Sequence, residues 1–152
     1  MKDIKKEALD KCADYLAKYS KTEREIERYL IKKGYTQDII AYCIDKLKGY
    51  NYLDDSEYCR LFIGSKIRTT GKRMIEQKLL IKGVDKQTIK ENLASYDDSQ
   101  AAVAVLAKYM KNKQPAKEVL QKAYRHLISR GFSYDTASET LSAFRDQLTA
   151  DN

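Results

Sequence analysis

Apolar positions recur at intervals of three and four residues along this chain, the spacing that one face of an α-helix presents to a core. Six glycines and one proline interrupt 152 residues, so the pattern predicts an all-α protein. Capping residues and glycines divide the pattern into nine predicted helices, at 4–18, 23–33, 37–47, 54–68, 72–82, 86–93, 99–109, 115–130 and 134–144.

One short stretch occurs three times. Leu-Ile-Lys-Lys-Gly-Tyr at 30–35 returns as Leu-Leu-Ile-Lys-Gly-Val at 79–84 and as Leu-Ile-Ser-Arg-Gly-Phe at 127–132, with its glycines 49 and 48 positions apart. A fixed period near this length is typical of repeat architectures. Each stretch is interpreted as a Schellman cap, in which glycine takes the left-handed conformation after the helix and the apolar residue beyond it touches the leucine.

Counting from these glycines gives a consistent register. Eight residues before them lie Ile26, Ile75 and Ala123, and ten residues after them lie Ile44, Leu93 and Leu141. The sequence therefore predicts three tandem three-helix repeats, at 1–53, 54–96 and 97–152. Each repeat is too small for a substantial core of its own, so we expect neighbours to pack into an elongated, curved, right-handed or solenoid-like array.

Helix starts carry recognisable caps. Thr22 and Glu25 form a predicted capping box, and Thr36 is placed to cap the helix that follows it. Asp54 and Asp55 resemble a metal or acid–base pair, but their place at a helix start favours capping. Pro115 suits the first position of a helix.

The chain offers little for catalysis or metal binding. Cys12, Cys43 and Cys59 stand among apolar residues without a CxxC pair, which predicts buried reduced thiols. His126, the only histidine, is interpreted as a surface or half-buried helix residue, and a single histidine assembles neither a zinc site nor a histidine triad. We expect no cofactor. No apolar run is long enough to span a bilayer, which favours a cytoplasmic protein.

Twelve tyrosines and no tryptophan raise the question of base stacking. Most tyrosines, such as Tyr15 and Tyr29, stand beside apolar helical positions, so packing at the core or its rim is the favoured interpretation. Tyr50, Tyr52 and Tyr96 fall between repeats and are predicted to join them.

The net charge is +7, and positive charge is concentrated between residues 60 and 82. The cations there are Arg60, Lys66, Arg68, Lys72, Arg73, Lys78 and Lys82, against the single acid Glu76. Cations attract phosphate whatever the base, and a loop at Thr69-Thr70-Gly71 would present several of them together with helix amides. The alternative is that these are solvated helix faces, as most lysines are. For seven cations against one acid, we favour a binding face.

A second candidate surface comprises Tyr124, Arg125, His126 and Arg130. Arginines beside a tyrosine can stack on a partner, or can donate two parallel hydrogen bonds to its phosphate or carboxylate group. Alternatively, Tyr124 belongs to the core and Arg130 serves only its helix end, and this structural interpretation has slightly more weight.

Nearly the whole chain resembles the RecX family, the bacterial regulators of RecA recombinase. The resemblance depends on the order and spacing of several stretches, namely Ala13-Asp14-Tyr15-Leu16, Lys33-Gly34-Tyr35, Tyr50-Asn51-Tyr52-Leu53-Asp54-Asp55, Lys82-Gly83-Val84 and Arg130-Gly131-Phe132-Ser133-Tyr134-Asp135.

The resemblance implies a non-enzymatic protein, expected to be a monomer, that lies in the groove of the RecA–single-stranded-DNA filament. Such proteins limit strand exchange, ATP turnover and co-protease activity in recombination, DNA repair and the SOS response. The predicted filament contacts are the seven cations of 60–82 with Arg125 and Arg130, binding the DNA backbone non-specifically.

An independent helical DNA-binding regulator is the alternative, since helix, glycine turn and helix also occur in helix-turn-helix domains. The helices at 37–47 and 86–93, however, offer few base-reading side chains beyond Asn92. An enzyme ranks last, because no nucleophile–base pair or phosphate loop is apparent.

Overall fold

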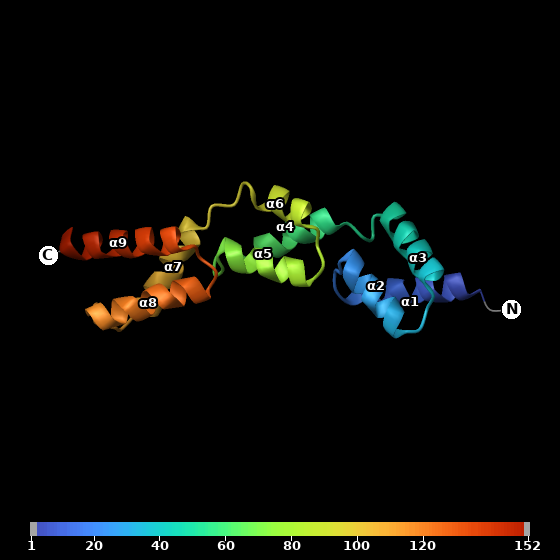
Figure 1. The fold of residues 1–152 in the computed structure, drawn as a ribbon, viewed down its shortest axis with the longest axis horizontal. Coiled ribbons are helices and arrows are strands. Elements are labelled where there is room, and N and C mark those ends of the chain that lie inside the picture. The colour runs from blue at the N-terminus through green and yellow to red at the C-terminus, as the bar shows by residue number, and fades with distance from the viewer. Residues whose placement is uncertain (1–2, 151–152) are drawn as a thin grey trace. The chain divides into compact units, whose positions relative to one another are not determined.

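The computed structural model describes residues 3–150, which form nine α-helices and no strand (Figure 1). This confirms the predicted all-α class. The helices are α1 (Ile4–Lys18), α2 (Glu23–Lys32), α3 (Gln37–Gly49), α4 (Asp55–Lys66), α5 (Lys72–Ile81), α6 (Lys86–Leu93), α7 (Ser99–Met110), α8 (Lys117–Ser129) and α9 (Tyr134–Ala150).

The helices sort into two compact units. The first unit contains the chain up to Leu61 together with Leu79–Asn92, and the second contains Phe62–Lys78 and the chain from Leu93 onwards. Helices α4 and α5 therefore contribute one part to each unit, so each unit holds a terminal helix trio and half of the middle one.

All three repeated glycines end a helix as predicted. Gly34, Gly83 and Gly131 have φ values of 89°, 88° and 95°. In each copy the glycine N–H and the next N–H donate backward to the helix, as Gly131 does to the Ile128 carbonyl (3.0 Å) and Phe132 to the Leu127 carbonyl (3.2 Å). These are the two hydrogen bonds of a Schellman cap, so the local prediction from the repeated stretch is confirmed.

The core of the first unit is built largely from α1–α3. Its fully buried members include Ala8, the register position Ile26 and Leu30 of the repeated stretch. Cys12 and Cys43 lie in the same cluster as free, buried thiols, as predicted. Burial, with the neighbouring Cys43 adding to it, raises the pKa of the Cys12 thiol to about 12, so Cys12 stays protonated and unreactive at neutral pH.

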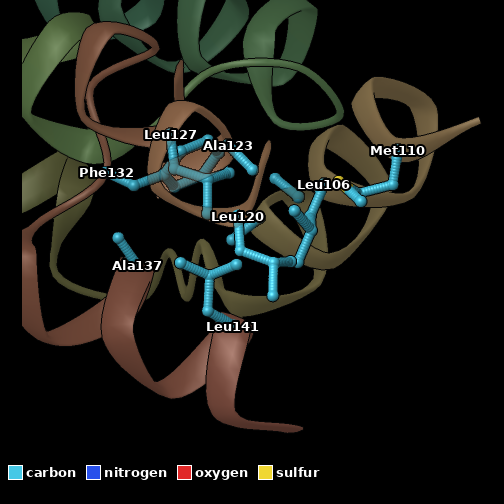
Figure 2. Packing of buried hydrophobic residues seen from close by; sticks show 10 residues of the cluster. Leu106, Met110, Leu120, Ala123, Leu127, Phe132, Ala137 and Leu141 are labelled. Atoms are coloured by element: carbon cyan, nitrogen blue, oxygen red, sulfur yellow. The ribbon is translucent and has the colours of Figure 1, made fainter. Parts of the chain in front are cut away.

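The core of the second unit lies between α7, α8 and α9, where Figure 2 shows side chains from the three helices pointing toward one another. Ala123, Leu127 and Phe132 are fully buried there. Ala123 and Leu127 occupy the positions that Ile26 and Leu30 hold in the first unit, counted from the glycine. The predicted register is thus the register of the two cores.

In the first unit, the start of α2 meets the end of α5. The Thr22 hydroxyl donates to the Lys82 carbonyl at 2.6 Å, and the Glu23 N–H donates to Asp55 Oδ1 at 2.9 Å. A Cβ added to Gly83 would overlap the Arg24 side chain. Asp55 therefore caps α2, a helix of the preceding repeat, while Asp54 caps its own helix by accepting from Glu57 N–H at 3.1 Å.

The second unit repeats this joint between the start of α5 and the end of α8. The Gly71 N–H donates to the Arg130 carbonyl at 2.8 Å, and the Arg73 N–H donates to the Gly131 carbonyl at 3.1 Å. Asp98, at the start of α7, accepts from the Lys72 N–H at 2.9 Å. In both units a carboxylate of the following repeat caps the second helix of the preceding one, and a C-terminal glycine packs on that helix start.

Several local predictions need correction. Pro115 precedes the N-cap Ala116 instead of occupying the first helical position, and the Thr36 side chain makes no cap hydrogen bond although Thr36 is the N-cap residue. Tyr50 and Tyr52 do not join repeats. They are 56% and 64% exposed and lie against each other on the turn after α3, where Tyr52 lines a groove with residues of α1 in its own repeat.

Other local predictions are confirmed. Thr22 and Glu25 form the capping box, and Ser133 accepts from the Thr136 N–H at 3.1 Å. The Tyr96 hydroxyl reaches the carbonyls of Ile67 (2.9 Å) and Thr70 (3.1 Å), which lie in its own repeat 54–96, so its role in joining repeats stays a prediction. Within residues 3–150, no helix has the length and apolarity to cross a membrane.

Candidate nucleic-acid interface

The centre of the predicted basic segment is the loop 67–71 between α4 and α5, which the second unit holds from several sides. Tyr96 binds the carbonyls at both ends of the loop, as described above. The Arg130 guanidinium donates from Nε (3.2 Å) and Nη2 (2.7 Å) to the Thr69 carbonyl. The Thr69 and Thr70 hydroxyls lie 3.2 Å apart. The loop is thus fixed through backbone carbonyls, and Arg68, the one cation within it, is exposed.

Five of the seven cations of the segment 60–82 belong to this unit, and the structure gives them different surroundings. Lys66 Nζ lies 5.6 Å from the centre of the Phe62 ring, and the Arg73 guanidinium lies 5.6 Å from that of Tyr134. Arg68 lines a groove with Asp97, and Lys78 is exposed. Cation–aromatic contacts at such a surface hold a charge in place without neutralising it, so Lys66 and Arg73 keep their attraction for phosphate.

Lys72 has acidic neighbours. Asp98 accepts a hydrogen bond from the Lys72 backbone N–H. Hydrogen bonds from Ser99 and, to a smaller extent, the charge of Lys72 keep the pKa of Asp97 below its ordinary value. Asp97 and Asp98 therefore offset part of the attraction of Lys72 for phosphate.

The remaining two cations of the segment, Arg60 and Lys82, fall in the first unit. Arg60 binds Glu57 through two hydrogen bonds, of 2.9 and 2.6 Å. Glu57 stands just outside the segment 60–82 whose charges were counted, and the spacing of three residues on one helix favours such a pair. Arg60 therefore brings no unbalanced charge to a binding face.

The second candidate surface divides into two grooves. Tyr124 and Arg125 line one between α8 and α9, of about 410 Å³. His126 and Arg130 line another, also of about 410 Å³, with Thr69, Val105, Lys108 and Tyr109. Adjacent helical residues face different directions, which explains the separation. Arg130 does have the structural role favoured from the sequence, but it binds the loop of the preceding repeat instead of its own helix end.

The groove that contains His126 and Arg130, here called the His126 groove, also has lining residues that were not predicted. His126 stacks on Tyr109 with the ring centres 4.8 Å apart, and Lys113 Nζ lies 4.5 Å from the centre of the Tyr109 ring on α7. The spacing of four residues between Tyr109 and Lys113 was the available sequence signal. The groove adjoins the basic loop through Thr69 and carries the cations Lys108 and Arg130, with no carboxylate among its lining residues.

His126 should titrate below the usual histidine range. Burial, then Arg130, then Lys113 lower its pKa from 6.5. Because the native state binds this proton less tightly than the unfolded chain, the stability contribution is complete above pH 6.5 and is lost as pH falls through the lowered pKa. Nuclear magnetic resonance of the single histidine measures this directly. Lys113→Gln should raise the pKa, and a native pKa at or above 6.5 would contradict the assignment.

Three family models match the chain in order: the first three-helix domain of RecX at residues 8–47, the second at 54–93 and the third at 96–141. A regulatory protein RecX from Clostridium botulinum strain Eklund 17B is 33% identical over 147 residues, which cover 90% of this chain and 69% of that protein.

The chain belongs to the RecX family. Relatives named regulatory protein RecX include those of Bacillus licheniformis (35% identical, 91% of this chain, 55% of the relative) and Bacillus subtilis strain 168 (32% identical, 99% of this chain, 58% of the relative). The chain thus spans little more than half the length of these two Bacillus relatives. The three tandem three-helix repeats predicted from the sequence are the domains of RecX.

Two solved RecX structures have the same fold. The structure of RecX from Lactobacillus salivarius aligns with a TM-score of 0.84 at 22% identity, covering 93% of this chain and 96% of that one. A second structure, of a regulatory protein RecX, aligns with a TM-score of 0.82 at 24% identity over 91% of this chain and 73% of that one. Identities this low support the fold, and they do not transfer individual binding residues.

Proposed function

We propose that this RecX chain binds the RecA–single-stranded-DNA filament and restrains it, limiting strand exchange, ATP turnover and co-protease activity. The observation that carries the proposal is membership of the RecX family across all three repeats. The relatives are named regulatory proteins, which supports a non-enzymatic role for this chain.

The basic loop supplies a physical basis for the DNA part of this role. Lys66, Arg68 and Arg73 surround a loop whose backbone is fixed by Tyr96 and Arg130. Cations on a fixed loop bind phosphates without reading bases. A protein that binds RecA-coated DNA of any sequence needs this kind of contact. We propose Lys72, Lys78, Lys82, Arg60 and Arg125 as secondary contacts.

Several weak contacts made together would account for selectivity for the filament. A chain that touches DNA phosphates and recombinase subunits at once gains from the high effective concentration of each second contact. We propose that the repeats 1–53, 54–96 and 97–152 act together in this way within one monomer, without a cofactor.

The test compares three targets at one salt concentration: assembled RecA–DNA filament, RecA alone and the bare single strand. We expect tight binding to filament and clearly weaker binding to either component, measured by fluorescence anisotropy of labelled protein. Equal affinity for bare DNA and filament would remove the proposal. A footprint on one duplex sequence would instead favour the independent DNA-binding regulator considered from the sequence.

A further inference from the structure

The first and third repeats each carry a stacked pair of rings. Tyr15 on α1 stacks on Tyr29 of α2, with ring centres 4.2 Å apart and planes inclined by 9°. Tyr109 on α7 stacks on His126 of α8, with centres 4.8 Å apart and planes inclined by 24°. All four residues are half-buried, so each pair lies at the rim of its core.

The two pairs occupy equivalent positions. Tyr29 and His126 each precede the C-terminal glycine of their helix by five residues. The first-helix rings, Tyr15 and Tyr109, each follow a buried core residue by three positions. The stacked pair therefore recurs at equivalent positions of the first and third repeats.

Each pair has cations over or beside its rings. Lys21 Nζ lies 4.7 Å from the centre of the Tyr15 ring, and Lys33 Nζ lies 5.6 Å from that of Tyr29. In the third repeat, Lys113 Nζ lies 4.5 Å from the centre of the Tyr109 ring, and Arg130 lines the same groove as His126. A flexible ammonium over an aromatic face can move aside, whereas a packed apolar side chain cannot.

Both pairs adjoin a basic groove. The groove of the first repeat, about 560 Å³, is lined by Tyr15, Glu25, Arg28, Tyr29, Lys32 and Lys33. Its one acid, Glu25, is already bound to the Thr22 N–H in the capping box at 3.0 Å. The groove of the third repeat is the His126 groove. Aromatic faces next to several cations are the combination that binds single-stranded nucleic acid, with bases stacked on rings and phosphates on cations.

We propose that the two ring pairs are equivalent contacts for single-stranded nucleic acid, each within its own unit. An unpaired base stacks on the outer face of Tyr15 or Tyr109, and the lysine over that face, Lys21 or Lys113, moves to the adjacent phosphate. This rests on the proposed function, and adds to it that the protein contacts bases as well as phosphates. The middle repeat differs, since Lys78 stands where the second ring would be, so its contact is with phosphate.

An abasic strand separates stacking from charge. The probes are a fluorescent oligothymidylate and a strand of the same length made of abasic sites, which carries the same phosphates without bases. We expect the wild-type chain to bind oligothymidylate about tenfold more tightly than the abasic strand for each engaged ring pair. Because no RecA is present, this measurement can fail while filament regulation survives, and the reverse.

Matched variants assign the preference to the rings. Tyr15→Leu with Tyr109→Leu should remove it by weakening thymidylate binding alone, while Tyr15→Phe with Tyr109→Phe should keep it and control for folding. Tyr50→Leu with Tyr52→Leu removes two exposed rings elsewhere and should change nothing. Lys21→Gln with Lys113→Gln should weaken both strands and lower the slope of log affinity against log salt by about 0.7 for each cation that contacts phosphate.

Three results would overturn the proposal. The first is equal wild-type affinity for the two strands, and the second is a leucine pair that weakens both strands alike. The third is a leucine pair that loses filament binding but keeps the thymidylate preference, because the rings would then contact a protein surface.

Discussion

Replacing Lys66, Arg68, Lys72 and Arg73 together by glutamate should abolish detectable filament binding, a loss of at least about a hundredfold, because each reversed charge turns attraction for phosphate into repulsion. The effect should exceed that of any single substitution, since four charges change around one fixed loop. Whatever binding remains should depend less steeply on salt, by about 0.7 in the log–log slope for each lost contact with a single strand. Anisotropy titrations between low and high salt measure both quantities.

The second unit should keep its fold when these four side chains are replaced by neutral ones. The loop is held through the carbonyls of Ile67, Thr69 and Thr70 and through backbone N–H groups, none of which depends on the four side chains. A glutamate at position 72 would, however, face Asp97 and Asp98. The neutral variant, with glutamine at all four positions, avoids that repulsion and should lose affinity while keeping wild-type helicity.

A control variant changes the same number of charges elsewhere. Lys86, Lys90, Lys117 and Lys122 are exposed on helices outside the loop, and replacing them by glutamine gives the same net charge as the neutral loop variant. We expect it to bind filament nearly as the wild type does. If the loop variant inhibits RecA normally, or if both variants weaken binding equally, the loop is not the contact, even though the family assignment stands.

The features that the sequence predicted correctly are local ones. Leucine, cation, glycine and apolar residue within six positions are sufficient to define a Schellman cap, because both of its hydrogen bonds close inside that stretch. The capping box at Thr22 and the burial of Ile26, Ile75 and Ala123 follow from similarly short patterns. Three copies of a short signal then fixed the repeat plan.

The joints between repeats could not be predicted in this way. Asp55 accepts from an N–H 32 residues earlier, and Asp98 from one 26 residues earlier, so no local pattern pairs the carboxylate with its helix. The local pattern at Asp55 indicates only a cap for its own helix. Arg130 was misassigned for the same reason, since its partner Thr69 lies 61 residues away.

Two further contacts around the candidate site could not be read from the sequence segments considered. Arg60 lies inside the basic segment 60–82, whereas its partner Glu57 lies just before that segment. Their spacing of three residues on one helix identifies the ion pair. The ring pairs do not show in single positions, because Tyr15, Tyr29 and Tyr109 each stand beside apolar helical positions and are interpreted as packing at the core or its rim. Only the alignment of repeats places a tyrosine and a histidine at one position, and only the structure shows that each is stacked.

Gly71→Ala should destabilise the second unit by about 3 kcal/mol, the upper part of the range for overpacking. An added Cβ would overlap the Gly131 carbonyl group and the Phe132 nitrogen. Those are backbone atoms of the joint, which cannot move aside as the end of a flexible side chain can. Gly71 does not require a left-handed conformation, so its substitution tests the close approach of the two helices alone. Chemical denaturation followed by circular dichroism gives the free energy of unfolding.

Gly34→Ala provides the complementary case. Its φ of 89° is left-handed, but nothing lies within 4 Å of an added Cβ. We therefore expect a loss of only about 1 kcal/mol, the cost of placing alanine in that conformation. Gly131→Ala combines both penalties, since its φ is 95° and its Cβ would overlap Met74, and it should cost about 4 kcal/mol.

The order of the three losses tests the joint. Gly71→Ala and Gly131→Ala act on the same contact, so the double variant should lose clearly less than the sum of the single losses, because a joint opened by one methyl group accommodates the other. Gly34→Ala, in the other unit, should add independently to either. Equal losses at positions 34 and 131, or full additivity of positions 71 and 131, would mean that α5 and α8 do not meet at these glycines.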